Sequence, residues 1–135
     1  MKKESYDLFK TSSTEEILSY LDKELKTRNE SPFWTDKVVP FSRAILSVLI
    51  VLRDQNRLFT PEGKSVDELT PELFLDWSDF VSLKVLYFRV EDVDTSILGE
   101  YLHMYNVNLE NETLDFPIAN YNLHQGVSNV IKSLL

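Results

Sequence analysis

Residues 33–54, which read FWTDKVVPFSRAILSVLIVLRD, form the longest apolar-periodic run of the chain. Within this run, apolar side chains recur at alternating steps of four and three residues, at Trp34, Val38, Phe41, Ile45, Val48 and Leu52. That spacing places them in one stripe along an α-helix, and Leu49 widens the stripe. Because so broad an apolar face has to be covered on several sides, the run predicts the central helix of a small all-α domain.

The length and the apolar content of the chain indicate one domain. A chain of 135 residues with 43% apolar composition can bury roughly two thirds of its unfolded surface. We predict a single all-α domain over residues 1–135, a small helical bundle of about five to seven helices around a long central helix at residues 33–55. The apolar run at residues 44–52 is far shorter than the ~20 residues that span a bilayer, so no membrane contact by this segment is expected.

Helix-start signals place the first two helices. Ser13 stands three residues before Glu16, the spacing of a capping box, and predicts a helix that runs to about residue 28. Pro32 is expected at the first helical position of the central helix, where its missing amide costs nothing. Pro40 lies further inside the same run, so the central helix is either kinked at Pro40 or begins there.

The second half of the chain carries three more helical patterns. Thr70 and Pro71 open a segment that extends to about residue 90, and the sequence leaves open whether it forms one helix or two. A short helix is predicted at 95–105, with Ile97 on its apolar side. A last helix begins at residue 118 or 119, and Gly126 inside it is expected to cost about 1 kcal/mol relative to alanine.

No catalytic, cofactor or metal site is predicted. The chain has no cysteine, and His103 and His124 lie on different predicted helices, without a second histidine at metal-binding spacing. They are therefore interpreted as core or surface histidines. The tripeptide at 63–65, Gly-Lys-Ser, ends like a phosphate-binding loop, but Leu58 stands where that loop needs its first glycine. The clustered aromatic residues at helical spacing are interpreted as core, with a small-molecule pocket as the alternative.

The charge is distributed unevenly, and this distribution points to a partner. Residues 1–64 are close to neutral, whereas residues 65–135 hold twelve acidic and three basic side chains. The acidic half at residues 65–135 repels a phosphate backbone, so we expect no direct nucleic acid binding. We predict that a protein partner docks on two acidic clusters and two apolar anchors, at Glu91, Asp92, Asp94, Leu109, Glu110, Glu112, Asp115 and Phe116. The alternative is that these carboxylates only solvate the surface.

Several segments together resemble the all-α domain of type IV secretion coupling proteins, the TraD/TraG-like ATPase family. They are the string Pro-Phe-Trp-Thr-Asp-Lys at 32–37, the long apolar helix that ends in Leu-Arg-Asp at 52–54, and the Leu-Thr-Pro-Glu-Leu segment at 69–73. The Tyr-Leu pair at 101–102 and the Asn-Leu-His-Gln-Gly string at 122–126 look like the closing part of that domain.

The resemblance implies a substrate-receptor role without catalysis. The parent protein would be a hexameric, membrane-anchored coupling ATPase, and this chain would be an excised domain that lacks the nucleotide-binding motifs. Such a domain sits at the cytoplasmic, inner face of the bacterial inner membrane. It recruits secreted substrates, relaxosome components, an adaptor or a regulator to the channel, in conjugation or other protein transport. The alternative is a freestanding acidic helical adaptor or chaperone that binds a partner protein.

Overall fold

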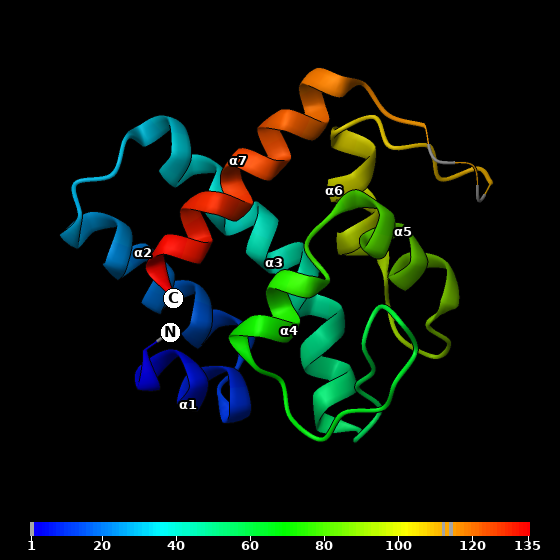
Figure 1. Ribbon diagram of the computed structural model, residues 1–135, viewed down its shortest axis with the longest axis horizontal. Coiled ribbons are helices and arrows are strands. Elements are labelled where there is room, and N and C mark those ends of the chain that lie inside the picture. The colour runs from blue at the N-terminus through cyan, green and yellow to red at the C-terminus, as the bar shows by residue number, and fades with distance from the viewer. Residues whose placement is uncertain (1, 112, 114) are drawn as a thin grey trace.

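The all-α prediction is confirmed by a computed structural model, which describes residues 2–111, 113 and 115–135 (Figure 1). Over these residues the chain forms seven helices and no strand, with one isolated bridge between Phe59 and Ser65. The helices are α1 Lys3–Thr11, α2 Thr14–Thr27, α3 Pro32–Asp54, α4 Pro71–Asp76, α5 Phe80–Arg89, α6 Ser96–Met104 and α7 Ile118–Leu134.

The predicted central helix, α3, is the element around which the others pack. Its apolar stripe is buried from Val38 to Leu52, while Trp34, at the first turn, is half-buried. Helices α2, α6 and α7 lie against α3, and Figure 1 shows α7 crossing in front of its N-terminal half. The four-three spacing therefore identified the core face of the domain correctly.

The start of α3 follows its sequence signals. The Ser31 side chain accepts a hydrogen bond from the amide of Phe33 (3.3 Å), and Pro32 occupies the first turn. The helix then continues through Pro40, so the alternative in which it begins at Pro40 is wrong. Since proline has no N–H, the carbonyl of Asp36 lacks the amide that a helix normally offers it four residues later.

The capping box predicted ahead of α2 is present. The Ser13 hydroxyl accepts from the amide of Glu16, and the Glu16 carboxylate accepts from the amide of Ser13, both over 3.2 Å. These two bonds satisfy amides that the first turn of a helix leaves without partners. The helix therefore begins where the sequence predicted.

The segment after Pro71 forms two helices, which settles the question that the sequence left open. Asp79 ends the connection between α4 and α5, and its carboxylate accepts a hydrogen bond from the amide of Ser82 (2.9 Å). Trp77, at the end of α4, is fully buried and donates its indole N–H to the carbonyl of Phe59 (3.0 Å). This bond holds the loop after α3 against the bundle.

The crossing of α7 over α3 requires a glycine. A Cβ atom placed on Gly126 would lie 2.6 Å from Cη2 of Trp34, which is closer than van der Waals contact allows. Gly126 is therefore more than the weak point in a helix that its propensity predicts. Its missing side chain lets the indole of Trp34 lie directly on the backbone of α7.

The two ends of the chain lie side by side (Figure 1). The amide of Lys2 donates to the carbonyl of Leu135 (2.8 Å), and the hydroxyl of buried Ser5 donates to the same oxygen (3.4 Å). Phe9 anchors α1 in the core, where its ring packs edge-on against Phe74 at 5.3 Å. The N-terminal helix thus closes the bundle beside the last turn of α7.

Candidate functional site

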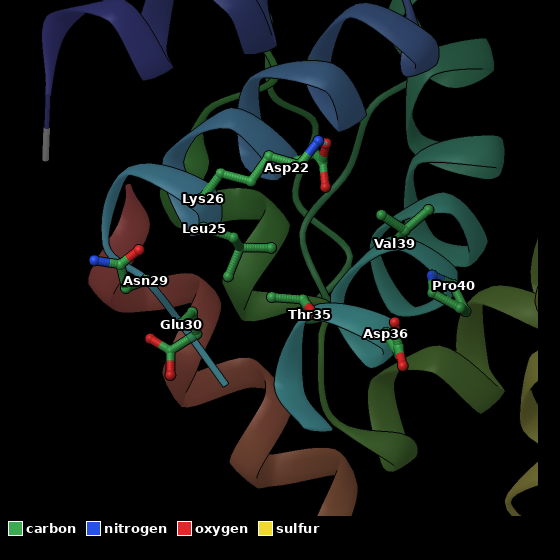
Figure 2. A pocket seen from close by; sticks show the side chains of 9 residues that line it. All are labelled: Asp22, Leu25, Lys26, Asn29, Glu30, Thr35, Asp36, Val39 and Pro40. Carbon is green, nitrogen blue, oxygen red and sulfur yellow. Dashed lines mark ion pairs between the residues drawn. The ribbon is translucent and has the colours of Figure 1, made fainter. Parts of the chain in front are cut away.

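One groove on the surface runs between the end of α2 and the start of α3. This α2–α3 groove has a volume of about 750 Å³, and Figure 2 labels its nine lining residues. Asp22 and Lys26 line it from α2, where they form an ion pair of 2.9 Å. Asp36 lines the opposite side from α3. Its polar lining consists of carboxylates together with the side chains of Lys26, Asn29 and Thr35.

A second, more apolar depression lies on the other side of Pro40, between α3 and α6. This α3–α6 hollow consists of two adjoining cavities of about 280 and 310 Å³, which share Pro40, Tyr101 and Met104. Val39, Arg43, Ile97 and Glu100 complete the first cavity, while Asp36, Lys37 and residues of α7 line the second. Because Val39 and Pro40 also line the α2–α3 groove, the two depressions meet along α3.

Two large apolar side chains of the hollow are exposed to solvent. Met104 is 60% exposed and Ile97 is 43% exposed, and both lie on α6. The position of Ile97 corrects the sequence interpretation, which placed it on the apolar side of this helix with the core residues. Seven residues separate it from Met104, so the two side chains share one face of α6. That face is turned toward Pro40 and solvent, while the core face is formed by Leu98, Tyr101 and Leu102.

The floor of the hollow belongs to a buried network of hydrogen-bonded polar groups. Tyr101, which is only 4% exposed, bonds through its hydroxyl to Nδ1 of His124 (2.8 Å). His124 Nε2 donates to the carbonyl of Ser78, and the Ser78 hydroxyl is 3.1 Å from that of Ser128. Since a carbonyl only accepts, Nε2 carries the proton and Nδ1 accepts from Tyr101. This network links α6, α7 and the α4–α5 connection.

Burial shifts the pKa values of the two aromatic members of this network, His124 and Tyr101. Desolvation lowers the pKa of His124 to about 4, against the smaller opposing effects of the Ser78 carbonyl and the Asp79 charge. Desolvation also raises the pKa of Tyr101 far above its ordinary value. His124 has no exposed surface and stacks on Phe80 at a centroid distance of 4.2 Å. It is therefore a neutral core histidine, one of the two readings that the sequence allowed.

The first predicted acidic cluster lies in the connection between α5 and α6. Glu91, Asp92 and Asp94 are all exposed. The Asp94 carboxylate accepts a hydrogen bond from the amide of Ser96 (2.9 Å), and this bond lowers the pKa of Asp94. The carbonyl of Glu91 accepts from the guanidinium of Arg57 (2.9 Å). Asp94 thus has a local structural role, whereas the exposed side chains of Glu91 and Asp92 make no ion pair among the described residues.

The second predicted cluster lies in the loop between α6 and α7. Glu110 and Asp115 are exposed, and Glu112 lies outside the described residues. The two apolar anchors, Leu109 and Phe116, are half-buried and pack against the core. The Phe116 ring lies 5.2 Å from that of Phe80, so much of its apolar surface already serves to hold the loop in place.

The structure keeps the two acidic clusters apart. Phe116 packs on Phe80, the first residue of α5, whereas Glu91 follows the last turn of that helix. Figure 1 shows the two connections as separate segments on the same side of the molecule. Between them, Lys84 is buried and donates from Nζ to the carbonyl of Thr113. The described residues of the two clusters therefore lie in separate connections of the same half of the chain.

The Gly-Lys-Ser tripeptide at 63–65 lies in a tight turn. Gly63 has a φ of 89° and donates its amide to the carbonyl of Thr60 (2.8 Å). The amide of Lys64 donates to the hydroxyl of Thr60 (3.1 Å). No helix begins after Ser65 until Pro71. Both amides are used within the turn, so this loop does not present the N–H groups that a phosphate requires.

Within the described part of the chain, no group of three or more histidine or carboxylate side chains is arranged to hold a metal ion. In the same residues, no helix combines the length and the hydropathy that crossing a bilayer would require. The chain matches no protein-family model, no curated protein and no solved structure. The resemblance to coupling proteins therefore stays a prediction.

Proposed function

We propose that this chain is a protein-binding domain that recruits a basic partner protein. The observation that carries the proposal is the unpaired negative charge of residues 65–135. Among the described residues, the one ion pair that reaches this half joins Lys10 Nζ to Glu68 (3.3 Å). Lys84, one of only three basic residues of this half, is buried and donates to a backbone carbonyl. The exposed surface is therefore more acidic than the composition alone indicates.

An acidic surface without internal partners acts at long range. It raises the rate at which a positively charged protein meets the domain, and it disfavours nucleic acids and acidic proteins. Because the two acidic clusters lie apart, they steer a partner toward this half rather than form one binding spot. Close contact then depends on apolar side chains that the partner can bury.

The more specific proposal is a receptor domain of a type IV secretion coupling protein. In this proposal the domain belongs to a hexameric, membrane-anchored ATPase at the cytoplasmic face of the inner membrane, and ATP hydrolysis belongs to the rest of that protein. The all-α fold supports it, and so does the packing between segments that carry the resemblance. Trp34 of the Phe-Trp pair lies directly on Gly126 of the closing segment.

A second candidate is a freestanding acidic adaptor or chaperone that masks a segment of its partner. The exposed apolar surface of the α3–α6 hollow favours this candidate, since it would cover a partner's apolar side chains. Genomic context separates the two candidates. An ATPase reading frame continuous with this segment supports the receptor domain, and a stop codon directly after Leu135 supports the adaptor.

The test of protein binding is capture from cells that encode a type IV secretion system, followed by titration of the captured protein at low and high salt. The test variant carries Glu91→Lys and Glu110→Lys, which leave the Asp94 hydrogen bond intact. The matched control carries Glu4→Lys and Asp7→Lys on α1, with the same total change in charge.

We expect the test variant to associate more slowly and with weaker salt dependence than wild type, while the control behaves like wild type. Equal binding by both variants would reduce the acidic clusters to solvated surface and move the search to the neutral half, around residues 17–28. Failure to capture any protein with the wild-type domain would contradict the proposed function itself.

A further inference from the structure

We infer that the α3–α6 hollow is the docking site for a basic amphipathic helix of the partner protein. The inference rests on the proposed protein-binding function and adds where the partner binds and what it presents. It locates the contact on the face formed by Pro40, Ile97 and Met104 rather than on the acidic connections. Shape, apolar exposure and charge each contribute a separate argument.

The apolar argument comes from side chains that nothing in the described chain covers. Ile97 and Met104 lie exposed on one face of α6, and Pro40 is exposed opposite them on α3. Together with half-buried Val39 they border a depression whose floor is Tyr101. Burying the exposed parts of Met104 and Ile97 against a partner would remove apolar surface from water, which favours association. Contact with a partner would therefore gain most from these two residues.

The charge argument comes from the rim. Of the two rim cations, Arg43 pairs with Glu15, whereas Lys37 Nζ lies 4.5 Å from the ring centroid of Phe33 and keeps its positive charge, so the two rim carboxylates face one uncompensated cation. Asp36 and Glu100 line the same hollow, and neither has an ion pair among the described residues. The complement of this rim is a segment that carries lysine or arginine beside its apolar residues.

The fold also favours a helix over an extended segment. Strand addition needs a sheet edge, and the described residues contain only the isolated bridge between Phe59 and Ser65, which lies outside the hollow. The walls of the hollow are two helices, α3 and α6, and an amphipathic helix lays its apolar side chains into such a depression at intervals of three and four residues. A basic amphipathic helix meets all of these requirements.

The methionine content of the chain supplies a direct probe. Met104 and Met1 are the only methionines, so ¹³C-methyl labelling yields two resonances, one of which reports on the hollow. The titrant is a synthetic amphipathic peptide of leucine and lysine. We expect the Met104 resonance to shift in a saturating manner while the Met1 resonance stays in place. A leucine and glutamate peptide, and a scrambled leucine and lysine peptide without helical periodicity, should produce no saturating shift.

Fluorescence anisotropy titrations of variants with a fluorescently labelled leucine and lysine peptide separate the contributions of apolar contact and rim charge to binding. Met104→Ser and Ile97→Ser remove exposed apolar contacts without adding charge, and Asp36→Asn with Glu100→Gln removes the rim charge. Each change is expected to weaken binding at least about tenfold. Val81→Ser is the matched control, because Val81 is 47% exposed on α5 and lines neither cavity of the hollow. It should bind the peptide like wild type.

Three results of the peptide experiments would overturn the inference. The first is equal binding of the acidic or the scrambled peptide, and the second is an equal loss of affinity in Val81→Ser. The third is a Met104 shift that depends on protein concentration without peptide, which would make a second copy of the chain the occupant. A captured partner that binds the Met104→Ser variant as tightly as wild type would show that the hollow is not its docking site, without contradicting the proposed protein-binding function. Absence of any partner would refute the function.

Discussion

Tyr101 donates its phenolic hydrogen to Nδ1 of His124 across 2.8 Å, inside the buried core of the bundle. The imidazole has its second hydrogen bond to the Ser78 carbonyl, so both ring nitrogens are satisfied without water. A buried polar group without a hydrogen-bond partner costs about 1–3 kcal/mol. Tyr101 and His124 can form their hydrogen bond only when α6 and α7 pack in one register. The hydrogen-bonded pair therefore helps to specify a single arrangement of these helices.

The first prediction concerns the acid stability of the domain. The pKa of His124 is about 4 in the folded protein and near 6.5 in the unfolded chain, because burial disfavours the charged imidazolium. Between these values the unfolded chain binds a proton that the folded protein does not bind. The contribution of His124 to the free energy of unfolding should therefore fall by about 3 kcal/mol as the pH drops from about 6.5 to 4, and this contribution should level off below that.

The measurement is urea unfolding at a series of pH values, with His124→Gln as the comparison. The glutamine amide can still donate to the Ser78 carbonyl, but it does not titrate. The variant should lose the fall in stability between pH 6.5 and 4, whatever its stability at neutral pH. An identical pH profile in both proteins would show that His124 does not carry this dependence.

The second prediction compares two isoleucines. Ile45 on α3 has no exposed surface, so Ile45→Asp places an unpaired charge in the core and should cost more than about 4 kcal/mol or prevent folding. Ile97→Asp introduces the same change on the exposed face of α6 and should cost less than about 0.5 kcal/mol. Circular dichroism and thermal unfolding of both variants test the burial of the central helix, and equal stability would contradict it.

The third prediction concerns the crossing of α7 over α3. Alanine normally stabilises a helix relative to glycine by about 1 kcal/mol, yet Gly126→Ala should destabilise this domain by about 1–3 kcal/mol. The reason is the 2.6 Å approach of a Cβ atom at this position to the indole of Trp34. Combining the change with Trp34→Phe removes the clashing ring atoms, so the double variant should lose less stability than the sum of the single changes.

The fourth prediction concerns nucleotides. Calorimetric titration with Mg-ATP should detect no binding, because the amides of Gly63 and Lys64 are bonded to Thr60 and no helix follows Ser65 directly. Lys64→Ala should give the same flat titration as wild type. Micromolar binding that disappears in Lys64→Ala would show that the turn opens to accept phosphates.

The features that could be predicted from the sequence are the ones encoded locally. The stripe from Val38 to Leu52 repeats every three or four residues, so its burial on one side of α3 follows from helix geometry. The capping box of Ser13 and Glu16 lies within a single turn, and the structure shows both of its hydrogen bonds. Elements of this kind need no knowledge of the rest of the fold.

The features that sequence patterns missed depend on contacts between distant segments. Gly126 is required by Trp34, far away in the chain, and no local pattern indicates that contact. The exposure of Ile97 and Met104 depends on which face of α6 the core covers, and the apolar spacing of α6 wrongly placed Ile97 with the core residues. A signal was available in the separation of these two residues, which puts them on one helix face, and in the acidic Glu100 between them.

The hydrogen bond between the Lys2 amide and the Leu135 carbonyl brings the two ends of the fold within reach of a short covalent bridge. A few glycine and serine residues would suffice to join them, and new termini could be opened in the connection between α6 and α7. The circular permutant would keep every helix pair that contacts α3. The domain could also be inserted into a surface loop of a host protein, because its adjacent ends would need only one insertion point. The Met104 face would then remain exposed to solvent.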